Sequence, residues 1–201
     1  MKELESKPEW KPRTKLGMLI ASGEIKSMEE VFSLGYRIQE SEITEKLLPD
    51  IKSEVIHVGI VQKQTDAGEF TRFKAIVAAG NGNGFLGLGE GKAKQMRNAI
   101  EKATKEAYMN IIPIRLGCGS WECRCTNNHS VPYKVSGKGG SVRIELIPAP
   151  RGLGIVAGDS IKTMLRLAGI KDVWTRSFGS TNTASSTSKA LYEALRNTFS
   201  M

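Results

Sequence analysis

The chain has 201 residues, and its 29 Lys and Arg against 21 Asp and Glu give a formal net charge of +8 at pH 7. This length suits one large domain or two small ones. No apolar run approaches the ~18 residues of a membrane span, and residues 1–15 are charged and hold Pro8 and Pro12, unlike a signal peptide. We therefore expect a cytoplasmic protein without a membrane partner. The positive charge indicates a polyanionic partner, with nucleic acid as the first candidate and a plain basic surface as the alternative.

The N-terminal part combines an irregular segment with two short helices. Residues 1–27 are rich in Lys and Glu and lack periodicity, which predicts an extension that is ordered only against a partner. Ser27, followed three residues later by Glu30, predicts the N-cap of a helix over 28–34. A second short helix is predicted over 44–48, because Pro49 ends it.

A β-hairpin and an amphipathic helix follow. Residues 54–64 and 69–79 are rich in β-branched side chains, and residues 65–68 have the chemistry of a turn. A third strand is predicted over 85–88 and a helix over 93–109. The order of helix, three antiparallel strands and helix over 28–116 resembles a double-stranded-RNA-binding fold, with helices on one face of the sheet.

Between the hairpin and that helix lies a run of alternating glycines from Gly80 to Gly91. Glycines lack Cβ atoms, so a phosphate can approach their backbone. Free N–H groups at the helix start, with Lys92 and Lys94 beside them, predict an anion site. The alternative is a turn followed by a glycine-rich strand, and the context does not fit a dinucleotide or Walker-type loop.

Residues 133–201 predict a second α+β domain. We expect strands over 133–136, 141–147, 153–157 and 173–178, with a turn at 137–140. Helices are expected over 160–168, capped by Asp159, and over 183–199, capped by Asn182. A strand, a crossover helix and another strand imply some parallel pairing.

The connecting loop, residues 117–132, contains Cys118, Cys123, Cys125 and His129 with the spacing C-x4-C-x-C-x3-H. Three thiolates and one imidazole can hold a structural zinc ion in a tetrahedral site, and a loop without a core gains order from a metal. Free thiols are the alternative. His57, alone in a predicted strand, is interpreted as a structural residue.

One loop raises an enzymatic alternative. Gly152-Leu153-Gly154 is similar to the phosphate loop of kinases related to galactokinase and homoserine kinase, where serines follow. Here Ile155 and Val156 stand in those places, so the required hydroxyls are missing. We find no catalytic constellation and expect no enzyme.

Several stretches together resemble the universal small-subunit ribosomal protein five family, S-five in bacteria and S-two in eukaryotes. They are VAAGNGNG at 77–84, GLGEGKA at 87–93, SVRIELIPAPRGLGIVAG at 141–158, LAGIKDV at 167–173 and FGST at 178–181. Residues 117–123 and the long N-terminal extension look like the archaeal branch. The resemblance implies a double-stranded-RNA-binding-like domain and a C-terminal α/β domain with a left-handed β-α-β crossover.

The resemblance also implies a place on the small ribosomal subunit, with contacts to small-subunit rRNA, ribosomal proteins four and eight, and mRNA near its entrance path. It implies roles in subunit assembly, decoding accuracy and mRNA unwinding. Basic proteins of this kind neutralise phosphates, and such domains read the shape of RNA rather than its sequence. The residues that the resemblance assigns to RNA are Arg72, Lys74, Gly82, Gly84, Gly87, Gly89, Gly91, Lys92, Lys94, Arg97, Lys134, Lys138, Arg143 and Arg151. Those assigned to protein contacts are Gly152, Gly154 and Gly158.

Overall fold

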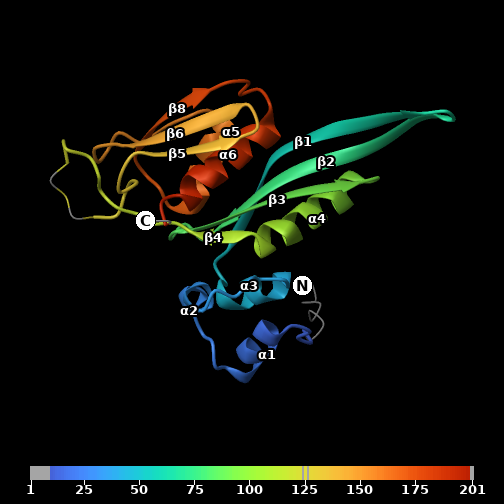
Figure 1. Cartoon of the computed structure of the whole chain (residues 1–201), viewed down its shortest axis with the longest axis horizontal. Helices are drawn as coiled ribbons and strands as arrows, with labels where there is room; N and C mark the ends of the chain where they lie inside the picture. Colours follow the sequence, from blue (N-terminus) through green and yellow to red (C-terminus); the bar gives the residue numbers. More distant parts are fainter. Residues whose placement is uncertain (1–9, 124, 126, 200–201) are drawn as a thin grey trace, which may run out of the picture. The chain divides into compact units, whose positions relative to one another are not determined.

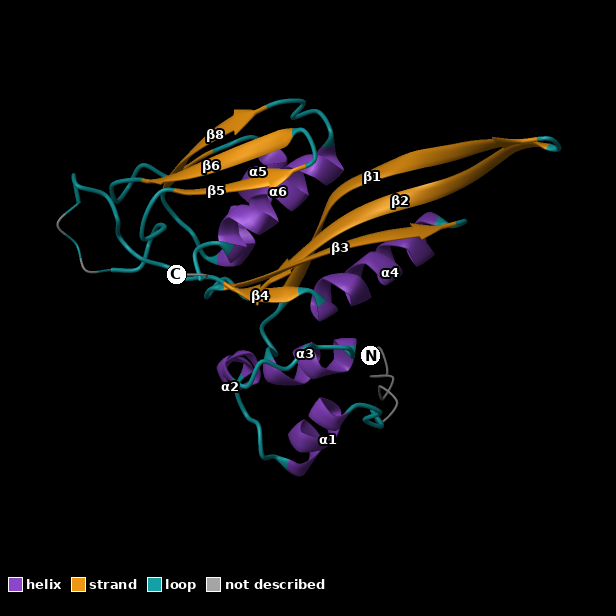
Figure 2. Ribbon diagram, in the orientation of Figure 1, coloured by secondary structure: helices purple, strands orange, loops and turns teal. Residues whose placement is uncertain are grey.

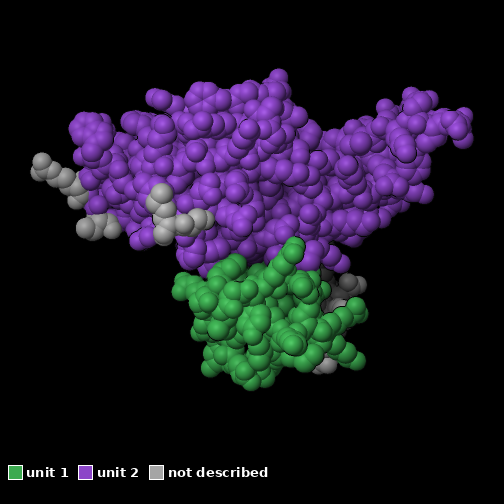
Figure 3. All heavy atoms as spheres, viewed as in Figure 1, with its two compact units in different colours: residues 1–49 green, residues 50–201 purple. Residues whose placement is uncertain are grey.

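The computed structural model describes residues 10–123, 125 and 127–199 (Figures 1 and 2). The chain divides into two compact units, residues 1–49 and residues 50–201 (Figure 3). We expected two short helices to begin a domain over residues 28–116. The structure instead places both helices in the first unit, apart from the strands that follow. Over the described residues, no helix is long and apolar enough to cross a membrane.

Over residues 10–49, the first unit contains three helices: α1 (Lys15–Ser22), α2 (Met28–Ser33) and α3 (Ser41–Leu47). The expectation of an irregular extension is wrong for α1, which is capped by the Thr14 side chain and ends at Gly23 with φ 82°. Long-range polar contacts order this segment. The Glu40 carboxylate accepts hydrogen bonds from Trp10 Nε1 at 2.8 Å and from the Thr14 amide at 2.8 Å. Neither contact leaves a periodic pattern in the sequence.

The capping of α2 is confirmed. The Ser27 hydroxyl accepts from the Glu30 amide at 3.3 Å, and the Glu30 carboxylate accepts from the Lys26 amide at 3.1 Å. Helix α3 begins at Ser41, three residues earlier than its prediction, and ends at Leu47.

The second unit begins with an antiparallel sheet of order β1-β2-β3-β4. Its strands are β1 (Lys52–Thr65), β2 (Gly68–Gly80), β3 (Phe85–Ala93) and β4 (Ile111–Pro113). The hairpin is confirmed, with Thr65 paired to Gly68 across the turn. Strand β3 runs five residues further than expected, so the glycine-rich strand is the correct alternative. Helix α4 (Met96–Met109) starts three residues later than predicted for the same reason.

The glycines of β3 allow α4 to pack directly on the strand. Gly87, Gly89 and Gly91 point to one face because side-chain directions alternate along a strand. A Cβ atom at each position would come within 3.0 Å of a backbone carbonyl oxygen of α4, belonging in turn to Ala107, Ala103 and Ala99. No side chain fits between the strand and the helix.

The second sheet has the order β5-β6-β8-β7. Its strands are β5 (Val135–Gly139), β6 (Val142–Pro148), β7 (Ile155–Val156) and β8 (Val173–Phe178). The predicted parallel pairing is confirmed between β7 and β8, and helix α5 (Asp159–Ala168) connects them. The handedness of this crossover stays a prediction. The chain ends in helix α6 (Ala184–Arg196).

Details of this second sheet differ from the prediction. The turn expected at 137–140 is wrong, because Gly137 and Gly139 continue β5 and lie against the backbone of α6. The N-cap of α5 is Gly158, one residue before the expected Asp159. The N-cap of α6 is Thr183, one residue after the expected Asn182.

The two sheets share one hydrophobic core. Ile76 and Leu86 of the first sheet belong to the same buried cluster as Leu146 of the second sheet and Leu165 and Leu191 of the helices. Helices α5 and α6 contact the first sheet on the face opposite α4 and lie between the two sheets (Figure 2). Helices therefore cover both faces of the first sheet rather than the one face expected. The α+β class is confirmed.

Candidate nucleic-acid interface and metal cluster

The glycine loop between β2 and β3 uses its amides internally. The Gly82 amide donates to the Leu167 carbonyl at 2.9 Å, and the Gly84 amide donates to the Ala168 carbonyl at 3.1 Å. The Asn81 side-chain oxygen accepts from the amides of residues 83 and 85 at 2.9 and 3.2 Å. Four successive amides thus have acceptors within the chain. These four amides are therefore not free for a phosphate, and the loop joins the first sheet to the C-terminal end of α5.

The glycines of β3 have a packing role, and their RNA contact stays a prediction. Gly87, Gly89 and Gly91 are all buried. The chain also does not begin a helix at Lys92, because β3 continues to Ala93 and α4 has no side-chain cap hydrogen bond at its start. The expected helix start beside Lys92 is therefore not where the glycine run ends.

Lys74, expected to face RNA, is half-buried in an internal polar cluster. Its Nζ lies 3.0 Å from Glu90 Oε2 and 3.1 Å from the Ser185 hydroxyl on α6. Lys189 pairs with the same carboxylate at 3.1 Å. Burial opposes ionisation of Glu90, but hydrogen bonds from Ser185, Lys74 and Lys189 hold its pKa below the usual value. Lys74 therefore links the first sheet to α6.

Arg72, Lys92 and Lys94 do lie at the surface. Arg72 and Lys92 border a depression of ≈440 Å³ near the end of the β1–β2 hairpin, together with Lys63 and Phe70. The Arg72 guanidinium is 4.9 Å from the centre of the Phe70 ring. Among the described residues, no acidic side chain lines this depression, and the hairpin end extends away from the helices (Figure 1). We call Lys63, Phe70, Arg72, Lys92 and Lys94 the hairpin surface.

The second sheet has an exposed face that is basic and aromatic. Strand pairing places Lys138 beside Arg143 and Arg143 beside Phe178. Trp174 and Phe178 are 37% and 51% exposed on this face. We call it the open sheet face; its members are Lys134, Lys138, Arg143, Glu145, Trp174, Arg176 and Phe178.

Glu145 lies at the centre of the open sheet face. Lys134 Nζ is 2.9 Å from one of its carboxylate oxygens, and Arg143 Nη2 is 3.0 Å from the other. The hydrogen bond from Lys134 and the nearby guanidinium groups lower the pKa of Glu145. Sequence reasoning found Lys134, Lys138 and Arg143 but missed Trp174, Arg176 and Phe178, which the two-residue period of β8 could have revealed.

The remaining expected RNA residues, Arg97 and Arg151, are exposed. Arg97 forms an ion pair with Glu101 one turn along α4, with a distance of 3.1 Å. Because 89% of the Arg97 side chain is accessible, this pair leaves its guanidinium available to a phosphate.

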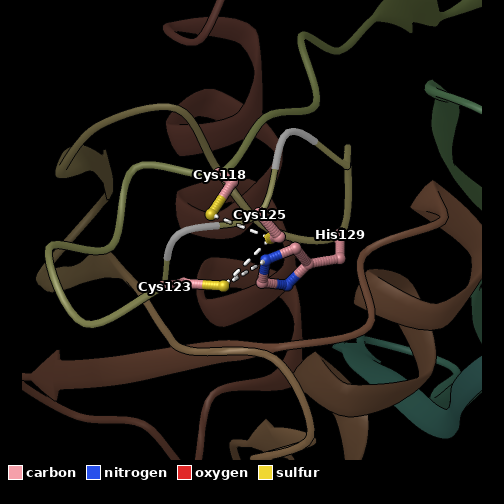
Figure 4. Close-up of side chains that lie close together, drawn as sticks. All are labelled: Cys118, Cys123, Cys125 and His129. Carbon is pink, nitrogen blue, oxygen red and sulfur yellow. Dashed lines mark hydrogen bonds between the residues drawn. The ribbon is translucent and has the colours of Figure 1, made fainter.

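The cysteine loop brings together the four residues that the spacing singled out (Figure 4). Their ligand atoms all lie within 4.8 Å of one another. Cys118 Sγ is 3.4 Å from Cys125 Sγ, and Cys123 Sγ is 3.7 Å from His129 Nε2. These separations approach the roughly 3.5 Å between ligands of a tetrahedral zinc ion. Hydrogen bonding with Cys125 lowers the pKa of Cys123 to about 6 and raises that of Cys118 to about 11. The cluster could hold one metal ion.

A buried carboxylate orients the histidine of this cluster. His129 Nδ1 lies 2.9 Å from Asp172 Oδ2, and each residue is 5% exposed. This contact leaves Nε2 directed toward the sulfur atoms, as in many metal sites where a carboxylate holds the second ring nitrogen of a ligand. The sequence analysis did not include Asp172 in the cluster, because it lies 43 positions from His129.

The same carboxylate argues against the kinase alternative, which the comparisons also do not support. Asp172 Oδ1 accepts from the Gly152 amide at 3.0 Å and from the Gly154 amide at 2.8 Å. The amides that a nucleotide phosphate would need are therefore bound to an anion of the chain itself.

A second depression, of ≈590 Å³, is lined in part by Leu153 and Gly154. It combines three cations, Lys162, Arg166 and Lys171, with apolar side chains, and none of the acidic residues in the described part of the chain lines it. We call it the α5 pocket; its other members are Gly82, Leu153, Gly154, Ile155, Gly169 and Ile170. Of the glycines expected to contact proteins, Gly154 lines this pocket. Gly152 and Gly158 do not line it, but both are exposed and lie within four residues of Gly154 in the sequence.

The fold and these surfaces define a two-sheet α+β protein with basic outer faces and a cysteine–histidine cluster. Family models described as ribosomal protein S5, N-terminal domain, and ribosomal protein S5, C-terminal domain, match residues 51–115 and 137–201. The chain belongs to the ribosomal protein S5 family, as the resemblance predicted.

Archaeal relatives match nearly the whole chain. A protein of Cenarchaeum symbiosum is 64% identical over 191 residues, covering 95% of this chain and 87% of that protein. A protein of Thermofilum pendens is 58% identical, covering 95% of both chains, and one of Sulfolobus acidocaldarius is 54% identical, covering 95% and 89%. Each is named small ribosomal subunit protein uS5.

Proposed function

We propose that this chain is a structural constituent of the small ribosomal subunit, located in the cytoplasm on the ribosome and without enzymatic activity. The observation that carries this proposal is family membership over both sheet regions, with relatives that are named as small-subunit proteins. The chain binds small-subunit rRNA and supports subunit assembly, decoding accuracy and translation. The net charge of +8 agrees with a polyanionic partner.

Two surfaces are suited to rRNA. The hairpin surface offers Arg72, Lys92 and Lys94 with Phe70 beside them. The open sheet face offers cations around Trp174 and Phe178, whose exposed rings can stack on unpaired bases. Lysine and arginine neutralise phosphates and release counterions, so binding through both surfaces weakens as salt rises. Arg97 and Arg151 add exposed cations to this set.

Protein neighbours are proposed for the α5 pocket. Its cations and apolar floor fit an acidic segment of a neighbouring protein that inserts an apolar side chain. Ribosomal proteins four and eight are the proposed neighbours, with Gly152, Gly154 and Gly158 at or near the contact. Contact with mRNA near its entrance path completes the proposal.

One structural zinc ion is proposed for the cysteine–histidine cluster. The three thiolates and His129 Nε2 would hold it. The Asp172 carboxylate would fix the orientation of the imidazole by accepting from Nδ1. When bound, such an ion supplies structural order to the loop rather than chemistry.

Sedimentation of a native lysate tests the ribosomal role. In about 0.5 M salt the Debye length falls to roughly 4 Å, so loosely held basic proteins dissociate from ribosomes. We expect the chain to stay with the small subunit in near-stoichiometric amount when it is followed by mass spectrometry. Sedimentation as a free 22.0 kDa protein would contradict the proposal.

Elemental analysis of the purified chain tests the zinc site. We expect one zinc ion per chain, lost in Cys123→Ser and in His129→Ala. His57→Ala is the matched control, because His57 is the other histidine of the chain and is exposed on β1. Retention of zinc by both cluster variants, or its absence from the wild-type chain prepared with zinc, would count against the site.

A further inference from the structure

The metal cluster and the loop over residues 150–154 are joined through one buried side chain, Asp172, and through a hydrogen bond from the Arg151 backbone amide to Cys123. Asp172 Oδ2 lies 2.9 Å from Nδ1 of the candidate ligand His129, and Asp172 Oδ1 accepts from the amides of Gly152 and Gly154. The two oxygens of a single carboxylate thus face the cluster on one side and the loop on the other. The amides of Lys171 and Asp172 also donate to the His129 carbonyl, at 2.9 and 3.1 Å. His129 and Asp172 are therefore bound to each other through both backbone and side chains.

Besides Asp172, two backbone contacts hold the loop: the Arg151 amide donates to Cys123, and the Gly154 carbonyl accepts from the Val173 amide at 3.2 Å. Within it, the Leu153 amide donates to the Pro150 carbonyl at a long 3.4 Å. Arg151, Gly152 and Leu153 are exposed, so apolar burial contributes little to their position. Gly152 and Gly154 have φ values of 90° and 79°, a conformation that needs an external partner to select it from the many open to glycine. The carboxylate of Asp172 supplies that partner.

The carboxylate in turn depends on the histidine. Asp172 is 5% exposed, and a buried charge is stable only when its hydrogen bonds are complete. A metal ion on His129 Nε2 would hold the ring from one side while Asp172 holds it from the other. Without the metal, the ring and the cysteine segments lose their common anchor, so Asp172 loses a fixed donor. The amides of Gly152 and Gly154 then donate to an Asp172 carboxylate whose own position is less fixed.

We propose that metal occupancy of the cysteine–histidine cluster positions residues 150–154, and through Leu153 and Gly154 sets the shape of the α5 pocket where a neighbouring protein binds. Asp172 is the positioning residue in this relay. The inference rests on the proposed zinc site and on the proposed protein contact at the pocket. It connects them by contacts that lie within one compact unit. Zinc would thereby act on a surface that carries none of its ligands.

Hydrogen exchange of the full chain, with zinc and after removal of zinc by a chelator, tests the proposal. We expect exchange of the amides in 150–154 to rise about tenfold on zinc removal, the effect of losing roughly one hydrogen bond to a charged acceptor. Exchange in β3 should not change, because that strand is held by its own sheet and by α4. Equal exchange of 150–154 with and without zinc, in a chain that binds one zinc ion, would overturn the relay and leave the zinc site intact. A chain that binds no zinc would overturn both.

Two variants separate the links of the relay if removal of zinc unfolds the loop entirely. Asp172→Asn keeps one oxygen for the glycine amides but cannot accept from His129 Nδ1, so we expect about 10-fold to 100-fold weaker zinc binding. Because the link to His129 is broken, exchange of its loop should no longer depend on zinc. Asp172→Ala removes both links, and its loop should exchange about tenfold faster even with zinc bound. Asp159→Ala, an exposed acid in the first turn of α5, is the matched control. Wild-type protection of the loop in Asp172→Ala would overturn the proposal.

Discussion

Gly89 of β3 lies so close to Ala103 of α4 that a Cβ atom at position 89 would fall within 3.0 Å of the Ala103 carbonyl oxygen. Gly87 lies against Ala107 and Gly91 against Ala99 in the same way. The strand and the helix therefore meet along a line of glycines and alanines. This contact explains why a glycine-rich stretch that resembles a phosphate loop forms a strand of the core.

The first prediction follows from this contact. Gly89→Ala should lower the free energy of unfolding by about 3 kcal/mol, because neither backbone can move aside without disturbing the sheet. Gly158→Ala is the control, since an added Cβ there meets nothing within 4 Å; it should cost at most about 1 kcal/mol as a change of helix cap. Urea unfolding followed by circular dichroism measures both. A Gly89→Ala chain as stable as the Gly158→Ala chain would contradict the packing argument.

The second prediction concerns the cluster of Glu90, Lys74 and Lys189. The pKa of Glu90 is lowered from its usual value of 4.5, so the ionised carboxylate stabilises the folded chain above that pH. This contribution should fall away as the pH drops below 4.5 and through the lowered native pKa. Glu90→Gln should cost about 1–2 kcal/mol at pH 7 and remove that part of the acid dependence. Urea unfolding of both chains from pH 7 to pH 3 is the measurement, and parallel pH profiles would refute the role of Glu90.

The third prediction tests the hairpin surface. Lys92→Ala combined with Lys94→Ala should weaken binding to a small-subunit rRNA transcript and reduce the slope of log affinity against log salt by about 1.5 to 2. Lys74→Met is the matched control: its ammonium is paired with Glu90, so the slope should stay at the wild-type value. Filter binding from 0.05 to 0.3 M salt measures the slopes. An unchanged slope in the double variant would rule out phosphate contacts by these two lysines.

The fourth prediction tests stacking on the open sheet face. Trp174→Ala should weaken binding to an unpaired RNA oligonucleotide about tenfold, because an aromatic ring that stacks on a base contributes about 1–3 kcal/mol. Trp121→Ala provides the comparison, since this tryptophan is 90% exposed but belongs to the cysteine loop rather than to a strand. Fluorescence anisotropy of a labelled oligonucleotide reports both affinities. Equal losses in the two variants would argue for nonspecific aromatic contact, and no loss in Trp174→Ala would exclude stacking there.

Local patterns were sufficient for much of the fold. The β-branched runs flanking residues 65–68 predicted the hairpin, and the capping residues Ser27 and Glu30 predicted the start of α2. Each of these signals depends on residues that are neighbours in the chain, so each can be recognised without knowing the fold. The spacing of the three cysteines and His129 likewise identified the members of the cluster that the structure brings together.

Only the tertiary structure decided what several of these residues do. The amides of Gly82 and Gly84 were expected to bind phosphate, but they bind carbonyl groups at the end of α5. Lys74 was expected to face RNA, but it contacts Ser185, which is 111 positions along the chain. Asp172 contacts His129 from 43 positions away. A glycine, lysine or aspartate carries the same local signal whether its partner is solvent, RNA or the chain itself. The sequence alone determined which groups were present and their local conformation, whereas long-range packing decided which donors, acceptors and charges were already used inside the fold and which remained for a partner.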